Sequence, residues 1–360
     1  MNPKILYIGY QSLSIKDSGG GLGCIRNHDA LVSLYGEDNV DTIVLEGTSK
    51  PSLVQKLKNN LIRIVKMHPF PIRQIRSIDY SKYDIVFIDS SRLGNIAKII
   101  KESGYKGKVI VFYHNFDYRF AKEFYKDASS IKRWINVRVS LQNEKNAVKY
   151  ADVNVILNER DAREMEDFYG INKIFRIPVS LNDRFDPNYQ CPSPFDHPTG
   201  INFLFIGSYF FGNVKGLDWF MENVYPSVNM NFVIVGKDMK KLRENPLYRD
   251  VEIHSDVKDI APFIKHADYM IMPLIGGSGM KIKTCESLMF GKSIIGTKEA
   301  FEGYEIDTDK VGALCLNAED FVTNIKKAKS GSFNQYSRDI FLEKYSFEAT
   351  LKLFKELIES

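Results

Sequence analysis

Short apolar runs alternate along the chain with longer stretches in which apolar residues recur at helical spacing. Runs rich in Val, Ile and Phe are typical of strands buried on both faces, and the periodic stretches are typical of the helices that cover them. The pattern predicts strands at 4–10, 42–45, 85–89, 109–113, 153–157 and 174–177, and a second series at 202–207, 232–236, 251–254, 269–273, 293–296 and 313–316. The predicted fold class is therefore α/β, with two doubly wound, Rossmann-like domains.

A proline-rich segment separates the two series of strands. Prolines cannot continue either regular structure, and four of them fall at positions 187, 192, 194 and 198. We therefore predict a first domain at 1–184, a linker at 185–199 and a second domain at 200–344. Doubly wound domains bind ligands at the carboxyl ends of their strands, so a cleft in which the two domains face each other is the expected active site.

Composition narrows the class of protein. The chain has 360 residues, 44% hydrophobic and 26% charged, which is typical of folded globular domains and excludes disorder. No apolar run reaches the roughly 20 residues that span a bilayer, and the N-terminal residues read as a strand rather than a signal peptide. The four cysteines have no paired spacing, which fits buried thiols in a reducing compartment. These features predict a cytoplasmic protein.

The segment 52–76 is basic and amphipathic. Its leucines recur near helical spacing, and from residue 50 to residue 76 it has lysines and arginines but no acidic residue. Two interpretations are open. The segment makes a peripheral contact with the inner face of the plasma membrane, or it is a surface helix whose apolar stripe packs on its own domain. The net charge of +4 is too small to indicate nucleic acid.

The segment 269–297 carries the most chemistry. An apolar strand leads into glycines at 276, 277 and 279, then into a helix start with Lys281, Lys283 and a single carboxylate, Glu286. Glycines allow close approach of a ligand, and amides at a helix N-terminus together with lysines favour a phosphate or diphosphate. Glu286 can accept hydrogen bonds from hydroxyls. A nucleotide-sugar site fits this combination; the alternative is an ordinary connection with solvated lysines.

These residues resemble the donor-binding signature of the retaining glycosyltransferases of family 4, the group 1 glycosyltransferases, which have the GT-B fold. The matching positions are Gly276, Gly277, Ser278, Gly279, Met280, Lys281, Glu286, Ser287, Gly291, Lys292 and Ile294 with Ile295. The family often has two glutamates with seven residues between them; Glu286 matches the second, which binds the ribose, whereas Ser278 replaces the first. The resemblance implies that Ser278, Gly279, Met280, Lys281 and Glu286 bind the donor. It also implies that a C-terminal helix, 345–360, packs back on the first domain.

Two further positions of the second domain match the family. Lys215, before Gly216, corresponds to a lysine that grips the donor diphosphate, while Ser208 stands near the position of the family's arginine. Val257 corresponds to the residue whose main chain binds the nucleobase. The alternative for Lys215 is a solvated surface lysine.

In the first domain, a glycine cluster and a histidine follow strands. Gly20 and Gly21 lie between the first strand and a helix start, and the resemblance implies that they contact the donor phosphate and the acceptor. The cluster lacks the spacing of a dinucleotide fingerprint, so a nicotinamide or flavin cofactor is not expected. His114 follows the fourth strand, where this fold class places ligands, and is the catalytic candidate. The alternatives are a structural turn and a structural histidine.

The resemblance implies an enzyme: a hexosyl- or related glycosyltransferase that moves a sugar from a nucleoside-diphosphate sugar to a glycan or lipid-linked acceptor with retention, in surface polysaccharide or glycoconjugate synthesis. We expect no metal and no cofactor, because lysines and helix amides stabilise the leaving diphosphate. Two alternatives stay open. One is a non-catalytic GT-B subunit that binds a partner or glycan, and the other is a sugar-nucleotide epimerase.

Overall fold

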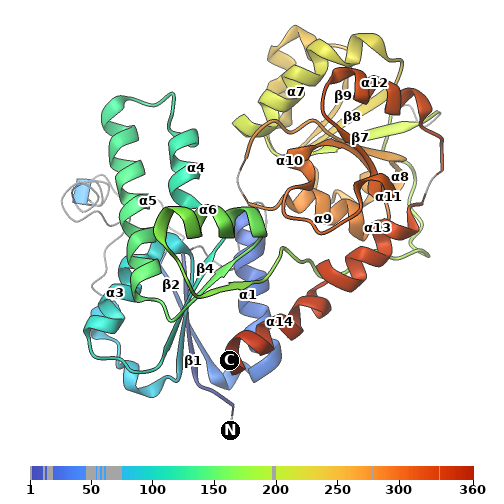
Figure 1. Cartoon of the computed structure of the whole chain (residues 1–360). Helices are drawn as coiled ribbons and strands as arrows, with labels where there is room; N and C mark the ends of the chain where they lie inside the picture. The colour runs from blue at the N-terminus through green and yellow to red at the C-terminus, as the bar shows by residue number, and fades with distance from the viewer. Residues whose placement is uncertain are drawn as a thin grey trace. The chain divides into compact units, whose positions relative to one another are not determined.

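The computed structural model describes residues 2–10, 13, 19–45, 54, 57–58, 61, 75–196, 200–277, 279–331 and 333–360 (Figure 1). It divides into unit 1, Met1–Pro178 with Leu351–Ser360, and unit 2, Val179–Thr350. Each unit contains one six-stranded sheet. The predicted class of two doubly wound α/β domains is confirmed, while a cleft shared by both stays a prediction.

The sheet of unit 1 is parallel and has the strand order β2-β1-β3-β4-β5-β6. Its strands are β1 Ile5–Gly9, β2 Val40–Val44, β3 Ile85–Asp89, β4 Lys108–Tyr113, β5 Val153–Ile156 and β6 Ile174–Arg176. The apolar runs that predicted them form the core: every residue of β1 and β3 is buried. Because the chain leaves β1 toward β2 and returns at β3, the order reverses between β1 and β3, and their carboxyl ends make a crevice.

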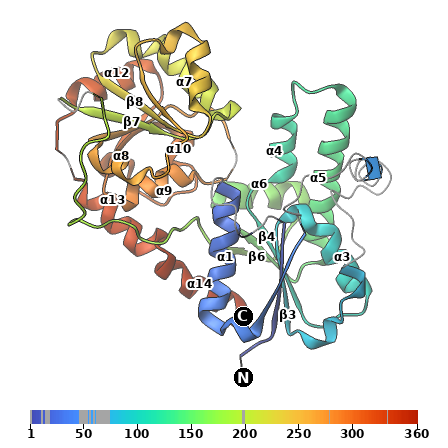
Figure 2. The ribbon, with the colours of Figure 1, turned by 180° about the vertical axis from the view of Figure 1, so that it is seen from behind.

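Helices cover both faces of this sheet. They are α1 Gly19–Tyr35, α3 Gly94–Glu102, α4 Asp117–Phe124, α5 Ser130–Tyr150 and α6 Glu159–Tyr169. Figures 1 and 2 show α1 on one face and α3 with α5 on the other. The end of α14, Phe347–Glu359, also belongs here: Phe354 is fully buried and its ring lies 6.5 Å from that of Phe87 in β3.

Unit 2 repeats the architecture with the parallel order β12-β11-β10-β7-β8-β9. Its strands are β7 Asn202–Ile206, β8 Asn231–Gly236, β9 Glu252–Ser255, β10 Tyr269–Met272, β11 Ser293–Thr297 and β12 Gly312–Cys315. The helices are α7 Phe211–Asn223, α8 Ala261–His266, α9 Ile282–Met289, α10 Lys298–Phe301, α11 Thr308–Val311, α12 Ala318–Lys327 and α13 Gln335–Ile340. The order reverses between β7 and β10, which places the crevice of this unit at their carboxyl ends.

The division between the units differs from the predicted one. It falls after Pro178 rather than after residue 184, and the described part of the predicted linker belongs to unit 2. Asp183 binds the Arg338 guanidinium of unit 2, with Oδ1 2.9 Å from Nη1. The Phe185 ring stacks on that of Phe333, with centroids 5.5 Å apart. The prolines predicted an irregular segment, and the structure has one there. The contacts of Asp183 and Phe185 with unit 2 place the start of this segment in unit 2.

Most of the segment 52–76 lies outside the described residues, and its predicted membrane contact stays a prediction. The apolar side chains of Val54, Leu57 and Leu61 that are described are exposed. Among the described helices, none has both the length and the apolar character needed to cross a bilayer.

Candidate functional site

The crevice of unit 2 is closed on one side by a close approach between α7 and the loop after β10. A Cβ added at Gly216 of α7 would lie 2.1 Å from the Pro273 carbonyl oxygen, so only glycine fits there. One turn earlier, a Cβ at Gly212 would lie 3.5 Å from the Gly276 carbonyl oxygen. The first turns of α7 therefore lie against the loop that contains Gly276, Gly277 and Gly279, called the glycine loop below. The N-termini of α7 and α9 meet at the carboxyl ends of β7 and β10, where backbone amides favour an anion.

Lys283, on the first turn of α9, lies at the centre of this crevice. Its Nζ donates to Asn213 Oδ1 at 2.7 Å and lies 4.3 Å from the centroid of the Phe205 ring. Burial, together with the charge of Lys281, lowers the pKa of Lys283 to about 7, against the opposing effect of Glu286. The ammonium is thus poorly solvated and gains from a nearby anion. The sequence showed the charge of Lys283 but did not single it out as a binding residue, because only the fold shows how poorly its ammonium is solvated.

Glu286 lies one turn further along α9 and is buried. Burial raises the pKa of its carboxyl to about 7, although Arg184 and Lys283 both oppose the rise. The Arg184 Nη2 lies 3.6 Å from Glu286 Oε1. Arg184 was assigned to the first domain by its position in the sequence, so its place beside Glu286 was missed.

Lys281 has a protein partner in the structure. Its Nζ donates to Glu299 Oε1 at 2.5 Å and to the Gly279 carbonyl oxygen at 3.0 Å. The side chain therefore fixes the glycine loop to α10. A ligand phosphate would have to share this ammonium with Glu299.

The other predicted residues of the glycine loop differ in which of their groups can contact a ligand. Gly279 has φ +63°, a conformation that favours glycine. The Met280 side chain is buried, and its sulfur accepts a hydrogen bond from the Val179 amide at 3.5 Å, so only its main chain can face a ligand. Ser278 lies outside the described residues.

Lys215 and Val257 both lie on elements that follow the carboxyl ends of strands in unit 2. Lys215 is exposed in the second turn of α7. Val257 is half-buried in the loop after β9, next to Asp256, whose φ is +58°. The fold thus places Lys215 and Val257 at the same sheet edge as Lys283. Their roles in donor binding stay predictions.

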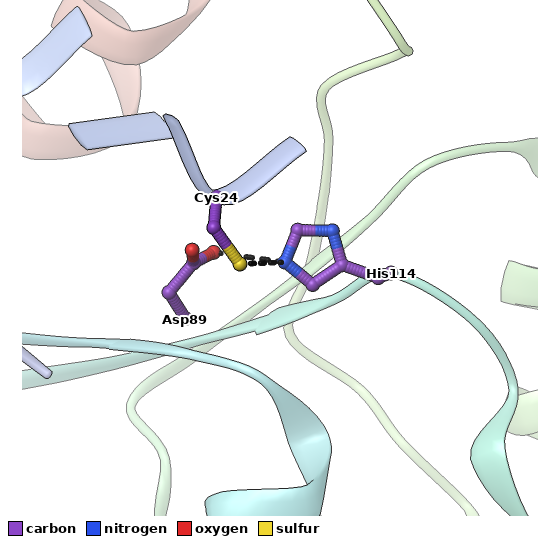
Figure 3. A group of neighbouring side chains, drawn as sticks. All are labelled: Cys24, Asp89 and His114. Carbon is purple, nitrogen blue, oxygen red and sulfur yellow. Dashed lines mark hydrogen bonds and ion pairs between the residues drawn. The ribbon is translucent and has the colours of Figure 1, made fainter. Parts of the chain in front are cut away.

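In unit 1, His114 follows β4 and faces two side chains from other elements (Figure 3). Its Nε2 lies 3.1 Å from Oδ1 of Asp89, the last residue of β3, and 3.7 Å from Sγ of Cys24 in α1. Asp89 is fully buried and also accepts hydrogen bonds from Asn27 Nδ2, at 2.5 Å, and from the Tyr7 hydroxyl. An ionised carboxylate only accepts, so this network assigns the proton to Nε2 and leaves a lone pair on Nδ1.

Gly20 and Gly21 lie in the first turn of α1, so the predicted glycine turn is itself the start of the helix. Further along, a Cβ added at Gly23 would lie 2.9 Å from Nδ1 and Cε1 of His114. Glycine at this position therefore lets α1 approach the histidine. The N-terminus of α1 and the imidazole lie at the same edge of the unit 1 sheet.

Two groups of described residues bring metal-ligand atoms within 4.8 Å of one another. They are Cys24 with Asp89 and His114, and Asp196 with Glu252 and His254. The first combines the sulfur, oxygen and nitrogen donors that zinc accepts. However, Asp89 already has the protein partners described above, which account for its charge without an ion. The predicted independence from metals and cofactors stays a prediction.

A pocket of about 210 Å³ lies between α4 and α5 in unit 1. Its apolar wall includes Phe120, Phe124 and Val139, and its polar wall includes Arg92 and Asp117. Burial raises the pKa of Asp117, and the carboxylate accepts from Ser91 Oγ at 2.5 Å. Asp117 follows His114 by one loop, so the pocket lies at the carboxyl edge of the sheet. A larger hollow of about 690 Å³ is lined by the loops that precede β3 and β4, at the opposite edge.

Comparison with known proteins bears on the fold of the chain and on its second unit. Residues 200–329, which include Lys215, Lys283 and Glu286, match the family model described as "Glycosyl transferases group 1". A search of curated proteins found no match.

Several solved structures resemble the chain over nearly its whole length. Sucrose-phosphate synthase from Thermosynechococcus elongatus has a TM-score of 0.74 and 14% identity, covering 99% of this chain and 98% of that one. A glycosyltransferase from Rickettsia africae has a TM-score of 0.64 and 17% identity, covering 99% and 97%. HepE from Anabaena, in complex with UDP and glucose, has a TM-score of 0.62 and 11% identity, covering 99% of both chains.

The chain is thus a GT-B protein, in which two Rossmann-like units are built on parallel sheets. Within its second unit, residues 200–329 match the group 1 glycosyltransferase model, which confirms for this part of the chain the resemblance seen in the sequence.

Proposed function

We propose that the protein transfers a sugar from a nucleoside-diphosphate sugar to a glycan or lipid-linked acceptor, with retention at the anomeric carbon and without a metal ion. The observation that carries this proposal is the pair Lys283 and Glu286, one helical turn apart on α9 at the switch point of unit 2, where Glu286 is buried and Lys283 is half-buried and held against Asn213 and the Phe205 ring. A lysine that is poorly solvated without a ligand suits a diphosphate, and a buried carboxylate suits ribose hydroxyls.

Departure of the nucleoside diphosphate leaves negative charge on the phosphate oxygens. A cation and amides that are already in place stabilise this charge at the moment it forms, which lowers the barrier to transfer. In this chain those groups are Lys283, Lys215 and the amides of the glycine loop, with Lys281 oriented by Glu299. His114 Nδ1, which bears a lone pair in the assigned tautomer, accepts from a hydroxyl of the transferred sugar.

The context of the reaction belongs to the same proposal. We place the enzyme in bacterial surface polysaccharide or glycoconjugate synthesis, in the cytoplasm or on the inner face of the plasma membrane. The 210 Å³ pocket between α4 and α5 offers apolar and polar walls, among them Asp117, three residues after His114, and suits part of an acceptor. The solved HepE complexes contain UDP and UDP-glucose, which makes these the first donors to test.

A thermal-shift screen of UDP, UDP-glucose and other nucleotides and nucleotide sugars tests the proposal. A ligand at 100 times its Kd stabilises the native state by about 2.7 kcal/mol, which gives a clear shift. Glu286→Ala should abolish the shift, whereas Glu319→Ala, an exposed acid on α12, should leave it unchanged. Full affinity in the Glu286 variant would contradict the site.

Turnover assays separate the alternatives. Sugar released or transferred from the donor identifies a transferase, and an acceptor-independent change of the sugar identifies an epimerase. Absence of both binding and turnover with every donor would favour a non-catalytic subunit.

A further inference from the structure

Helices α4 and α5 of unit 1 form a hairpin that extends beyond the sheet. The two helices lie side by side, and the turn 125–129 that joins them stands clear of the strands in both views (Figures 1 and 2). The tip of this hairpin, defined here as 122–138, contains the end of α4, the turn and the start of α5.

The tip exposes large apolar side chains. Ile131 is 73% exposed, Trp134 is 52% exposed and Phe124 is 45% exposed. Ile131 and Trp134 are three residues apart on α5, so they lie on one face of the helix, and Phe124 ends the neighbouring helix. Single exposed apolar residues are ordinary, whereas a group of them at the end of a projecting element marks an interaction surface.

Basic side chains surround these apolar residues. Exposed cations of the tip are Lys122, Lys126, Lys132, Arg133 and Arg138, against the acids Glu123 and Asp127. The Arg138 guanidinium lies 5.8 Å from the centroid of the Trp134 ring, and Lys132 Nζ lies 5.9 Å from that of Tyr125. Aromatic rings with an apolar body and a polar edge, flanked by long cationic side chains, are typical of the interface between water and lipid.

We propose that this tip docks on an anionic lipid surface, with Ile131, Trp134 and Phe124 inserted at headgroup level and the cations facing lipid phosphates. Charge complementarity favours this occupant, because the surface combines excess positive charge with apolar residues that need a non-aqueous environment. This surface is separate in the sequence from the predicted donor residues and from segment 52–76. It adds a place of contact for a lipid-linked acceptor, but its test does not require that acceptor.

Sedimentation with phosphatidylcholine vesicles, with and without about one third phosphatidylglycerol, measures the partition constant directly. The chain has two tryptophans, so a Trp219→Phe variant makes Trp134 the sole tryptophan. We expect binding to the anionic vesicles, a blue shift of Trp134 emission and quenching by brominated lipid. Neutral vesicles should bind much more weakly.

Two sets of variants separate the apolar from the electrostatic contribution. Ile131→Ser combined with Trp134→Ser should lower the partition constant about tenfold or more, because the inserted apolar area is lost. Lys132→Gln combined with Arg133→Gln should lower it about 30-fold, because each basic residue near an anionic surface contributes about a factor of five. Leu316→Ser is the matched control, since Leu316 is 77% exposed but lies in unit 2.

Equal binding to neutral and anionic vesicles, or undiminished binding by both double variants, would overturn the proposal. So would a change of oligomeric state in the Ile131/Trp134 variant, which would identify a second copy of the chain as the occupant. The thermal shift with the nucleotide sugar is measured in the same variants. If the tip is separate from the donor site, that shift stays intact, and the failure of one proposal can be told from the failure of the other.

Discussion

The Asp89 carboxylate at the end of β3 orients the His114 imidazole, which follows the neighbouring strand β4, with Oδ1 3.1 Å from Nε2. Tyr7 and Asn27 hold Asp89 in turn, and Gly23 leaves room for the ring. The network selects one tautomer of His114 and one orientation of its ring. Nδ1, the nitrogen not bound to Asp89, lies on the side of the ring next to Gly23 of α1, and it is the atom that we propose accepts from the sugar.

Asp89→Asn should therefore lower turnover of the sugar nucleotide by about 10- to 100-fold, with a small effect on donor affinity, because the amide no longer fixes the tautomer. Turnover and the donor KM are measured together, and Asp79→Asn, an exposed acid of the same unit, is the control. If His114 acts through this contact, adding His114→Ala to Asp89→Asn should cost little more than His114→Ala alone. Additive losses would contradict the relationship.

The pKa values of Lys283 and Glu286, both about 7, predict a bell-shaped pH dependence of donor affinity. Below neutral pH, Glu286 becomes protonated and loses acceptors for ribose hydroxyls. Above neutral pH, Lys283 loses the ammonium that attracts the diphosphate. Affinity for UDP-glucose, measured by calorimetry from about pH 5.5 to about pH 9, should peak near neutrality, and binding on the alkaline side should take up protons.

Variants assign the two limbs of this curve. Lys283→Met should flatten the alkaline limb and weaken binding about tenfold or more at neutral pH, as expected when a hydrogen bond to a charged group is lost. Glu286→Gln should flatten the acid limb. A pH-independent affinity in the unmodified protein would contradict both assignments.

Two glycines near the crevice of unit 2 should behave oppositely when replaced by alanine. Gly216→Ala places a methyl 2.1 Å from the Pro273 carbonyl oxygen, so it should lower the free energy of unfolding of unit 2 by about 1–3 kcal/mol or more. Gly276→Ala meets no atom within 4 Å. It should leave the melting temperature nearly unchanged but weaken donor binding, because the methyl projects where the ligand approaches. Chemical denaturation and calorimetry measure the two effects.

Removal of metal ions should leave both donor affinity and turnover unchanged. The cations proposed for the diphosphate are lysines and helix amides, which a chelator does not remove. The assay compares protein treated with EDTA with protein supplied with Mg²⁺, Mn²⁺ or Zn²⁺. A loss of activity that one of these ions restores would show that the proposal of a metal-independent enzyme is wrong.

The strands could be predicted from the sequence because buried parallel strands require continuous apolar runs, and all twelve predicted runs are strands. Asn158 precedes a helical stretch in the sequence, as an N-cap residue does, and in the structure it caps α6 by accepting from the Asp161 amide at 2.9 Å. The sequence also places a helix start near Tyr118, within one residue of the observed start of α4, but the residue that caps this helix could not be predicted. The amides of Asp117 and Tyr118 donate to Glu144 of α5, at 2.6 and 3.0 Å, and no local pattern predicts a cap that comes from another helix.

The candidate site could likewise be predicted from the sequence only where its residues are close together along the chain. Glycines, lysines and Glu286 are contiguous, so their pattern indicated an anion site. In contrast, the contact of Lys283 with Asn213 and that of His114 with Asp89 join residues far apart in the sequence. Their partners depend on strand order, which the apolar runs do not encode.

The assignment of Leu351–Ser360 to unit 1 has a consequence for how the chain is made. Phe354, fully buried and with its ring 5.3 Å from the Arg26 guanidinium, completes a core whose other members are synthesised before Pro178. On the ribosome, the whole of unit 2 emerges before this last piece. Unit 2 is therefore the part that can finish folding first, while the N-terminal unit waits, with a gap in its interior, until residues 351–360 have been made.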